Sequence, residues 1–483
     1  MSSILFIALP LLFGFSTPLF SKLGKNSVAY ISTLMQLFLL YLAFNLLSTT
    51  TSHIEIISIA PPLGISFVLN KVSLFFVLLF TLMVNIFSLY YLTHRKINPY
   101  KDETKFFILV NMLLASTIGL VLSSDIFNIY VFFEIAGISA YILSAYEKTP
   151  SALEAGLKYL ITGAIASVFL VFAIALIYIN IGSLNLAIIA QHFEMLPYNI
   201  KLLISIFLLI GFGFKVEILP LNFWVVDVYQ GSTSLINALF SAIVVKAYLF
   251  VFFHIFYLFL PQGEFALFLV YLGAISMLVA EIAGLRQTNL KRVFAYSSLG
   301  QVALIFSAFA MQNVDAIQGA LYIVLAHSVA KLTIFLALTS INKEHNSFHI
   351  ETLKELNSPF LRFIILIAML SLLGLPLFAG FIGKFLFLKS LALNSLLGVL
   401  FIIILASLIE AVYYFKLIGF MFSKTTKKAP LSIGLNHKIL FSFLTFIILF
   451  VGIIPISISG FLLDGAYSML DSVTYIQNLI KGQ

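Results

Sequence analysis

Apolar residues form long, nearly unbroken runs along this chain, and short polar segments separate them. A helix that crosses a bilayer needs about 20 such residues, and fewer can suffice. The pattern predicts an all-α membrane protein, because barrels show short alternating segments instead. Fourteen runs qualify and are numbered here as spans 1 to 14: 4–20, 28–47, 71–92, 106–122, 124–146, 153–180, 202–222, 233–259, 265–284, 293–310, 316–341, 361–390, 394–422 and 439–462.

The segment 54–70 contains a proline pair and is expected to form an interfacial or short paired piece. Composition supports a membrane protein, since hydrophobic residues make up 61% of the chain and charged residues 10%, against roughly 25% in soluble domains. The chain has no cysteine, which excludes cysteine-ligated iron–sulfur clusters, disulfides and thiol catalysis. It also lacks a glycine-rich phosphate loop and a Cys/His metal set, so we expect no cofactor and no metal in it.

Basic residues gather in the loops that lead from odd to even spans, although the net charge is only +8. They are Lys22, Lys25, His94, Arg95, Lys96, Lys101, Lys105, Lys148, Arg286, Lys291, Arg292, Lys343, Lys354, Arg362, Lys424, Lys427, Lys428 and Lys438. The other loops carry acidic residues, with Lys201 as the main exception. Cytoplasmic loops are enriched in lysine and arginine, so both termini are predicted outside the cytoplasm, in a cell-membrane protein.

Short matches recur within the chain and indicate two related units of five spans, 4–8 and 9–13. Because five is odd, the second unit would be inverted, and the prolines predict a discontinuous helix in spans 7 and 12. The pairs are Pro220 with Pro376, Lys246 with Glu410 and Tyr159 with Tyr322, which lie 156, 164 and 163 residues apart. The resulting segments are 1–105 (three N-terminal helices), 106–260 and 261–422 (the repeats) and 423–483 (C-terminal helix and tail).

Several ionisable residues fall inside the predicted spans, where they are costly. Such groups usually face a partner charge or a water-filled path, so ion transport is the first functional expectation. The candidates are Glu134, Lys215, Glu217, Lys246, His327, Lys331, Lys384 and Glu410.

Glu134 and Lys215 lie near the middle of their spans in the same unit, and each is the natural partner of the other. A lone carboxylate in lipid takes up a proton, whereas a nearby lysine keeps it ionised. The pair either changes the lysine's affinity for a proton or only fixes helix packing. Function is favoured, because a desolvated ion pair seldom gives net stability. Glu217 is expected at most to neutralise Lys215 locally.

Lys246 and Lys384 can carry protons, because a buried lysine releases its proton and an arginine does not. His327 and Lys331 share one face of span 11 at i, i+4 spacing. Histidine titrates closest to physiological pH. Taken alone, His327 is as well explained as a packed histidine that is hydrogen-bonded to backbone. Its position one helical turn from Lys331 favours a role in relaying protons. Glu410 either ends this series of buried ionisable residues or connects the series to solvent.

Six stretches together resemble the antiporter-like subunits of the complex I superfamily. They are DIFNIYVFFE (125–134), EAGLKYLITGAIAS (154–167), LPLNFW (219–224) after Lys215, LKRVFAYSSLGQ (290–301), HSVAK (327–331) and GLPLFAGFIGKF (374–385). The resemblance covers spans 4 to 13. It leaves open the NADH–quinone oxidoreductase, Mrp antiporter D-type and membrane-bound hydrogenase branches.

The resemblance implies a proton path along the membrane midplane through Glu134, Lys215, Lys246 and Lys384, with His327 and Lys331 bridging. It also implies a non-redox subunit, inactive alone, that assembles with other membrane subunits and, in the respiratory branches, with peripheral iron–sulfur subunits. Such a subunit moves protons, and the resemblance leaves open whether sodium is the exchanged ion. Nucleic acid is not an expected partner. The rival hypotheses are a stand-alone secondary transporter of a small solute or cation, and a structural scaffold that tolerates neutral replacements of its buried lysines.

Overall fold

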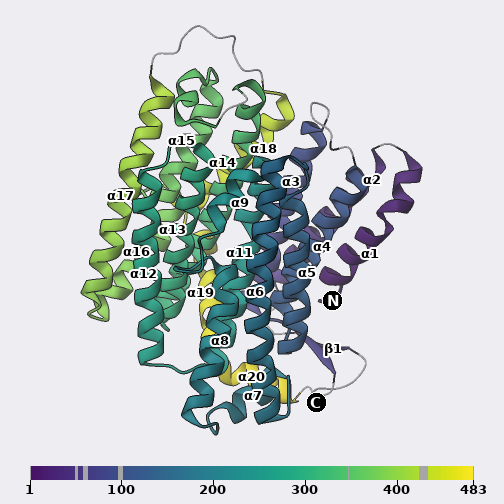
Figure 1. The fold of residues 1–483 in the computed structure, drawn as a ribbon, viewed down its shortest axis with the longest axis vertical. Helices are drawn as coiled ribbons and strands as arrows, with labels where there is room; N and C mark the ends of the chain where they lie inside the picture. The colour runs from purple at the N-terminus through teal and green to yellow at the C-terminus, as the bar shows by residue number, and fades with distance from the viewer. Residues whose placement is uncertain are drawn as a thin grey trace.

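The structure is a computed structural model that describes residues 2–24, 26–48, 53–57, 64–95, 100, 102–345, 348–423 and 433–481. Its helices run mainly along one common axis (Figure 1). In the described part, thirteen helices are long and apolar enough to cross a membrane. The remaining predicted span is divided into two shorter helices, α15 (Pro359–Leu373) and α16 (Ala379–Leu393). The prediction of an all-α, multi-pass membrane protein is confirmed.

The elements follow the predicted spans in order. The first half contains α1 (Leu5–Phe20), α2 (Ser27–Asn45), β1 (His53–Ile57), β2 (Ile65–Leu69), α3 (Lys71–His94), α4 (Glu103–Leu122), α5 (Ile126–Ser144), α6 (Pro150–Ile181), α7 (Leu186–Phe193), α8 (Tyr198–Val216), α9 (Val225–Gly231), α10 (Ser234–Leu239) and α11 (Val245–Phe259). The second half contains α12 (Glu264–Leu285), α13 (Leu290–Ala310), α14 (Val314–His345), α15, α16, α17 (Leu397–Phe422), α18 (Leu435–Ile453), α19 (Ile456–Leu470) and α20 (Ser472–Lys481). Short 3₁₀ turns lie at Ser21–Leu23, Leu46–Ser48 and Ile350–Glu355, and a π-helical turn at Phe240–Val244.

Polar side chains cap the first turns of many spanning helices. Asp102, Asp125, Thr149, Asn289 and Ser358 each accept hydrogen bonds from backbone N–H groups two or three residues further on. These N–H groups have no partner within the helix. The caps therefore satisfy donors that lipid could not satisfy.

The segment after α2 forms the expected paired piece. Strands β1 and β2 are antiparallel, with Glu55 opposite Phe67. The Glu55 carboxylate accepts hydrogen bonds from the backbone N–H groups of Ser3 (2.6 Å) and Ile4 (2.9 Å). The hairpin thereby fixes the beginning of α1.

Both predicted helix breaks are present. Helix α8 ends at Val216 and α9 begins at Val225, with Pro220 between them. Helix α15 ends at Leu373 and α16 begins at Ala379, with Pro376 between them. The discontinuous helices are confirmed, while the inverted relation between the two five-span units stays a prediction.

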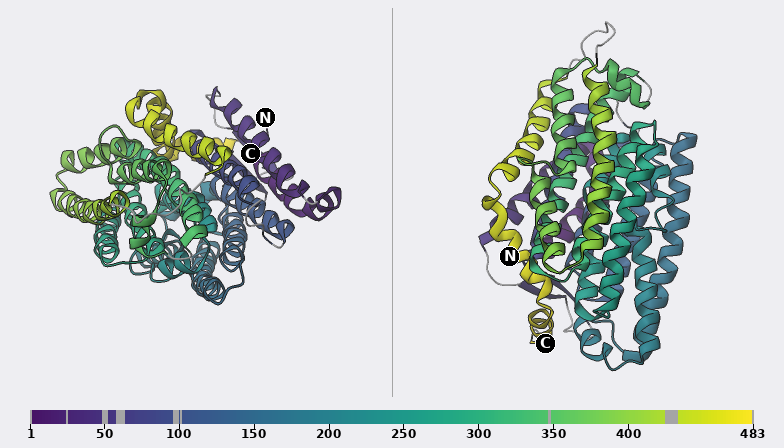
Figure 2. Two further views of the ribbon diagram at one scale, coloured as in Figure 1. Left: turned by 90° about the horizontal axis from the view of Figure 1, so that it is seen from above. Right: turned by 90° about the vertical axis from the view of Figure 1, so that its left-hand side faces the viewer.

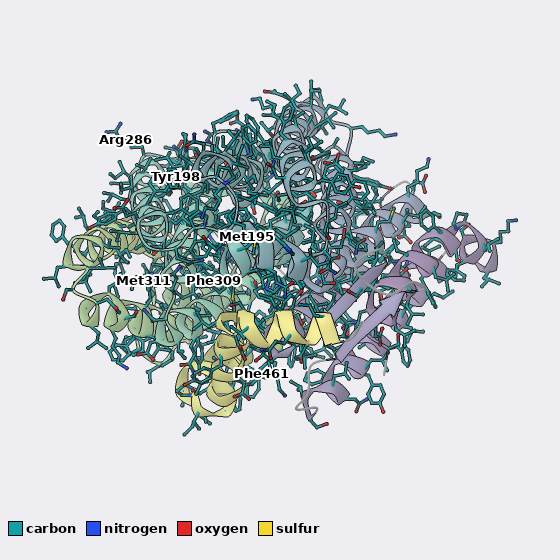
Figure 3. All side chains as sticks on the ribbon, turned by 90° about the horizontal axis from the view of Figure 1, so that it is seen from below. Met195, Tyr198, Arg286, Phe309, Met311 and Phe461 are labelled. Carbon is teal, nitrogen blue, oxygen red and sulfur yellow. The ribbon has the colours of Figure 1, made fainter. Side chains whose placement is uncertain are left out.

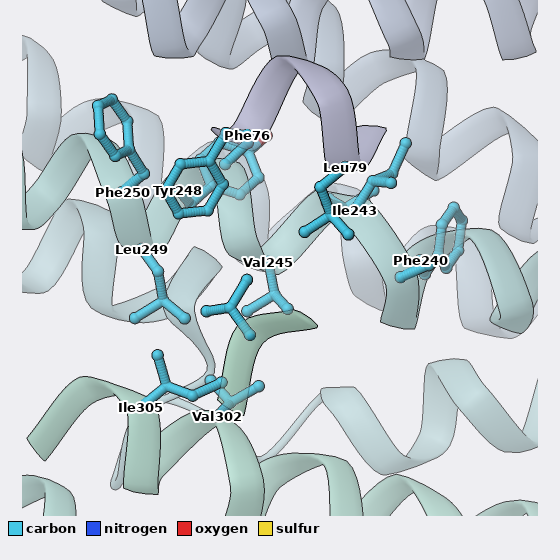
Figure 4. Close-up of a cluster of buried hydrophobic side chains, with 14 of the residues drawn as sticks. Phe76, Leu79, Phe240, Ile243, Val245, Tyr248, Leu249, Phe250, Val302 and Ile305 are labelled. Carbon is cyan, nitrogen blue, oxygen red and sulfur yellow. The ribbon is translucent and has the colours of Figure 1, made fainter. Parts of the chain in front are cut away.

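The span formed by α10, the π-helical turn and α11 lies at the centre of the bundle, and nearly all of its side chains are buried. Figure 4 shows Val245 of this span between Phe76 of α3 and Ile305 of α13. A π turn has one more residue per hydrogen-bonded ring than an α turn and often marks a functional position. Here it ends two residues before Lys246.

The C-terminal helices close the bundle. Helices α18 and α19 pack against both α3 and α14, and from above they lie beside the N-terminal helices (Figure 2). Gln318 of α14 donates to the Ser459 carbonyl (3.1 Å), and the Tyr322 hydroxyl donates to the Pro455 carbonyl (2.9 Å). Helix α20 then crosses the end of the bundle that carries Met195 (Figure 3) and packs against α7.

Candidate functional site

The structure buries most of the predicted ionisable groups inside the bundle. Lys246, His327, Lys331 and Glu410 are fully buried, Lys215 is 2% exposed and Lys384 is 7% exposed. Glu134 is partly buried. These groups come from α5, α8, α11, α14, α16 and α17, so six helices contribute to one row.

Lys215 lies in the last turn of α8 inside a cage of aromatic rings. Its Nζ donates to the Tyr141 hydroxyl at 2.5 Å. It lies 5.2, 4.5, 5.1 and 5.6 Å from the ring centroids of Phe133, Tyr141, Tyr159 and Tyr248. Ring faces attract a cation most strongly where water is excluded. The cage can therefore hold the ammonium form without a carboxylate in contact.

Two glycines make the space for this contact. A Cβ on Gly163 would lie 1.7 Å from the Tyr141 hydroxyl and 3.0 Å from the Lys215 Nζ. A Cβ on Gly137 would lie 2.7 and 3.2 Å from the same atoms. Any larger residue at Gly163 must therefore displace the hydroxyl that binds Lys215.

The direct contact expected between Glu134 and Lys215 is not formed. The described ion pairs do not include these two residues, and the Glu134 Oε1 atom is buried without a hydrogen-bond partner among the described residues. The two charges interact at longer range, and the Tyr141 hydroxyl takes the position next to the ammonium. The sequence identified two interacting groups but missed the tyrosine that binds one of them.

Lys246 is the first lysine beyond the cage. Its Nζ donates to the Ser241 carbonyl, which lies in the π-helical turn. The opposite charge that acts on Lys246 is Glu217, for which the sequence predicts at most a local effect on Lys215. Glu217 adopts a left-handed backbone (φ 63°) directly after α8, so its side chain does not continue the helix face that carries Lys215.

His327 and Lys331 lie one turn apart on α14, as predicted. Both ring nitrogens of His327 are buried without a hydrogen-bond partner among the described residues, and Lys246 and Lys331 both act on the ring electrostatically. The Lys331 Nζ donates to the Phe294 carbonyl and to the Ser297 hydroxyl, each at 2.8 Å. The charges of two lysines, Lys246 and Lys331, therefore both act on the His327 ring.

The second helix break holds the other end of the row. The Lys384 Nζ lies 3.2 Å from Glu410 Oε2 and donates to the Leu373 carbonyl at 3.1 Å. Leu373 is the last residue of α15, so the break supplies this acceptor. Gln301 donates to both Glu410 oxygens, at 2.9 and 3.0 Å. Lys384 and Glu410 form the only ion pair among the described residues in which both side chains are under 10% exposed.

The sequence argument missed one ionisable residue of this region. Glu281 lies in α12, is fully buried and accepts a hydrogen bond from the Tyr413 hydroxyl at 2.6 Å. The rule that selected the other candidates, a charge inside an apolar span, applies to Glu281 equally. Gln301 and Tyr141 gave no such signal, because neither carries a charge at neutral pH.

A cavity of about 1600 Å³ lies where α5 ends and α6 begins. Tyr141, Tyr100, Glu147 and Lys291 line it, and the exposed Lys105 lies at its edge. Burial raises the pKa of the Glu147 carboxyl, and the Lys291 ammonium counteracts part of this shift. The cavity therefore leads from the surface to the tyrosine that binds Lys215.

Known proteins share both this sequence and this architecture. Residues 123–410 match the family described as NADH:quinone oxidoreductase/Mrp antiporter, TM. NADH-quinone oxidoreductase subunit N 2 of Symbiobacterium thermophilum is 33% identical over 358 residues, which are 69% of this chain and 70% of that protein. A chain of the membrane-bound sulfane sulfur reductase, an archaeal respiratory membrane complex, superposes with a TM-score of 0.91 at 30% identity over 99% of both chains.

A chain of the Mrp complex from Dietzia sp. DQ12-45-1b superposes with a TM-score of 0.88 over 99% of both chains, but at 18% identity, so this likeness shows the fold alone. The family match spans more than half of the chain and includes the whole row from Glu134 to Glu410. As the sequence motifs predicted, the chain belongs to the NADH:quinone oxidoreductase/Mrp antiporter family, as an antiporter-like membrane protein of the complex I superfamily.

Proposed function

We propose that this chain conducts protons across the membrane through its buried row, as one subunit of a larger membrane complex. The observation that carries this proposal is the set of buried ionisable groups that six helices place inside the bundle. Glu134 acts on Lys215, Glu217 acts on Lys246, and both Lys246 and Lys331 act on His327. Lys331 interacts with Glu410, which is ion-paired with Lys384.

Lysine chemistry supports this function. Several ammonium groups cannot all stay charged in a low-dielectric interior, since like charges repel and each lacks water. The row therefore holds fewer protons than it has sites, and a proton that arrives at one site favours release from the next. The cavity lined by Tyr141 provides the path by which protons reach the row from the cytoplasm.

The assembly partners are other membrane subunits, because the matched chains belong to multisubunit complexes. Identity is higher to the respiratory complex (30%) than to the Mrp complex (18%), which favours a redox-driven complex over a cation/proton antiporter. The chain carries no redox cofactor of its own in this proposal, so iron–sulfur partner subunits supply the driving reaction. Mass spectrometry of the complex purified through a tagged chain tests this: the absence of iron–sulfur subunits would favour the Mrp branch.

Replacing Lys331 tests proton conduction itself. Lys331→Met keeps the side-chain volume but removes the proton site, so proton uptake by inverted membrane vesicles should fall about tenfold or more. Lys389→Met is the control, because Lys389 pairs with Asp315 on the surface (2.8 Å) and should keep wild-type uptake. Uptake is normalised to assembled complex. Wild-type transport by an assembled Lys331→Met complex would contradict the proposal.

The proposed topology places both termini outside the cytoplasm, in the cell membrane. The chain has no cysteine, so introduced cysteines report position without background. Glu194 and Lys105 have similarly exposed side chains, 74% and 75%. Glu194→Cys should react with an impermeant maleimide in intact cells, and Lys105→Cys only after permeabilisation. Labelling of Lys105→Cys in intact cells would contradict the proposed topology and indicate the opposite orientation.

A further inference from the structure

Glu281 is a buried carboxylate that the row described above does not use. Its Oε2 accepts the Tyr413 hydroxyl at 2.6 Å, and its Oε1 has no hydrogen-bond partner among the described residues. On the facing helix, a Cβ at Gly300 would lie 1.8 Å from this Oε1. The unpartnered oxygen therefore occupies a space that exists only because residue 300 has no side chain.

Glu281 lies near the end of the row. Glu410, Lys384 and Lys331 all act on it electrostatically, and Glu410 is the strongest of the three. Glu410 is fully buried and held by Gln301 and Lys384.

Tyr413, which binds Glu281, lies one turn after Glu410 on α17. Gly300, which faces Glu281, precedes Gln301, which binds Glu410. The two carboxylates therefore lie near each other in the buried interior.

The two carboxylates have unequal surroundings. Glu410 has an ammonium at 3.2 Å and an amide donor on both oxygens. Glu281 has one neutral donor, Tyr413, and no ammonium within 4 Å among the described residues. Like charges in one buried site cannot both be ionised at low cost, and the proton resides on the group with less support for its charge.

We propose that Glu281 and Glu410 share one exchangeable proton, which rests on Glu281, and that this pair terminates the row. When an N–H bond of the Lys384 ammonium breaks, the proton forms an O–H bond on Glu410. The O–H bond of Glu281 then breaks and its proton passes to a water molecule at the end of the row, after which the proton on Glu410 moves to the vacated Glu281 carboxylate. The number of protons is conserved in each transfer. The inference rests on the proposed function, because a chain that moves no protons has no use for such a pair.

The test uses the assembled complex in inverted vesicles. Glu281→Gln keeps the shape but cannot exchange a proton, so uptake should fall about tenfold or more, whereas Glu281→Asp should retain part of the activity. Infrared spectroscopy should show that a protonated carboxyl band present in the wild type is absent from Glu281→Gln. The matched control is Glu264→Gln, on the exposed first turn of the same helix, which should keep both the band and the transport.

Wild-type transport by Glu281→Gln, or an unchanged carboxyl band in that variant, would overturn the proposal that Glu281 and Glu410 share a proton. If Glu281→Gln does not assemble, Tyr413→Phe removes only the hydroxyl, and a carboxyl band that does not shift would overturn it equally. An inactive Lys331→Met complex beside an active Glu281→Gln complex refutes the pair alone. Wild-type activity of both variants refutes proton conduction through the row.

Discussion

An arginine at position 384 is expected to stop proton transport while it keeps the buried ion pair. The guanidinium can still bind Glu410 and the Leu373 carbonyl, the two partners of Lys384. It does not release its proton, because its pKa lies far above that of lysine. Uptake by inverted vesicles, normalised to assembled complex, should fall about a hundredfold, close to the value for Lys384→Ala.

The control lies five residues further along the same helix. Lys389 is 46% exposed and pairs with Asp315, so Lys389→Arg preserves a surface ion pair and should transport at the wild-type rate. If Lys384 only joined helices, arginine would rescue function and alanine would not. A Lys384→Arg complex that pumps like the wild type would therefore refute a relay through this lysine.

Loss of the Glu134 carboxylate is expected to have the second large effect. Glu134 supplies the negative charge that acts on Lys215, although the two groups are not in contact. Without this charge, protonation of the caged Lys215 amine is less favourable, because burial favours its neutral form. Glu134→Ala should reduce proton uptake about tenfold or more, and Glu134→Asp should retain part of the activity.

Glu154→Ala serves as the matched control, because Glu154 is 66% exposed and pairs with Lys158 at 2.7 Å. Exposed ion pairs contribute roughly 0–1 kcal/mol, so this variant should fold and pump normally. Equal transport by the Glu134 and Glu154 variants, with equal amounts of assembled complex, would remove Glu134 from the path.

The fold was predictable from the sequence because lipid leaves few options for the backbone. Apolar runs had to be helices, and Pro220 and Pro376 had to interrupt them. For 54–70, the proline pair made a span unfavourable and predicted an interfacial or short paired piece, which the strands β1 and β2 form. The left-handed turn at Glu217 could not be predicted, because residues other than glycine seldom adopt it. The action of Glu217 on Lys246 was therefore not visible in the sequence.

The candidate site was predictable as far as charge indicates it. A charged residue in an apolar run is visible without a structure, whereas its neutral partners are not. Tyr141, Gln301 and Ser297 resemble ordinary packing or helix residues until three dimensions place them beside lysines and glutamates. The π-helical turn before Lys246 has no sequence signal either.

The packing of α18 and α19 against α3 and α14 has a consequence for biosynthesis. A chain emerges from the ribosome N-terminus first, so α3 enters the bilayer long before the helices that will cover it have been made. The seam marked by Gln318 with Ser459 and Tyr322 with Pro455 can close only when nearly the whole chain has been translated. Until then, Gln318 and Tyr322 of α14 lie on an open face of the bundle. This face needs insertion factors or neighbouring subunits to shield it during synthesis. The supply of these factors would therefore limit the yield of the protein.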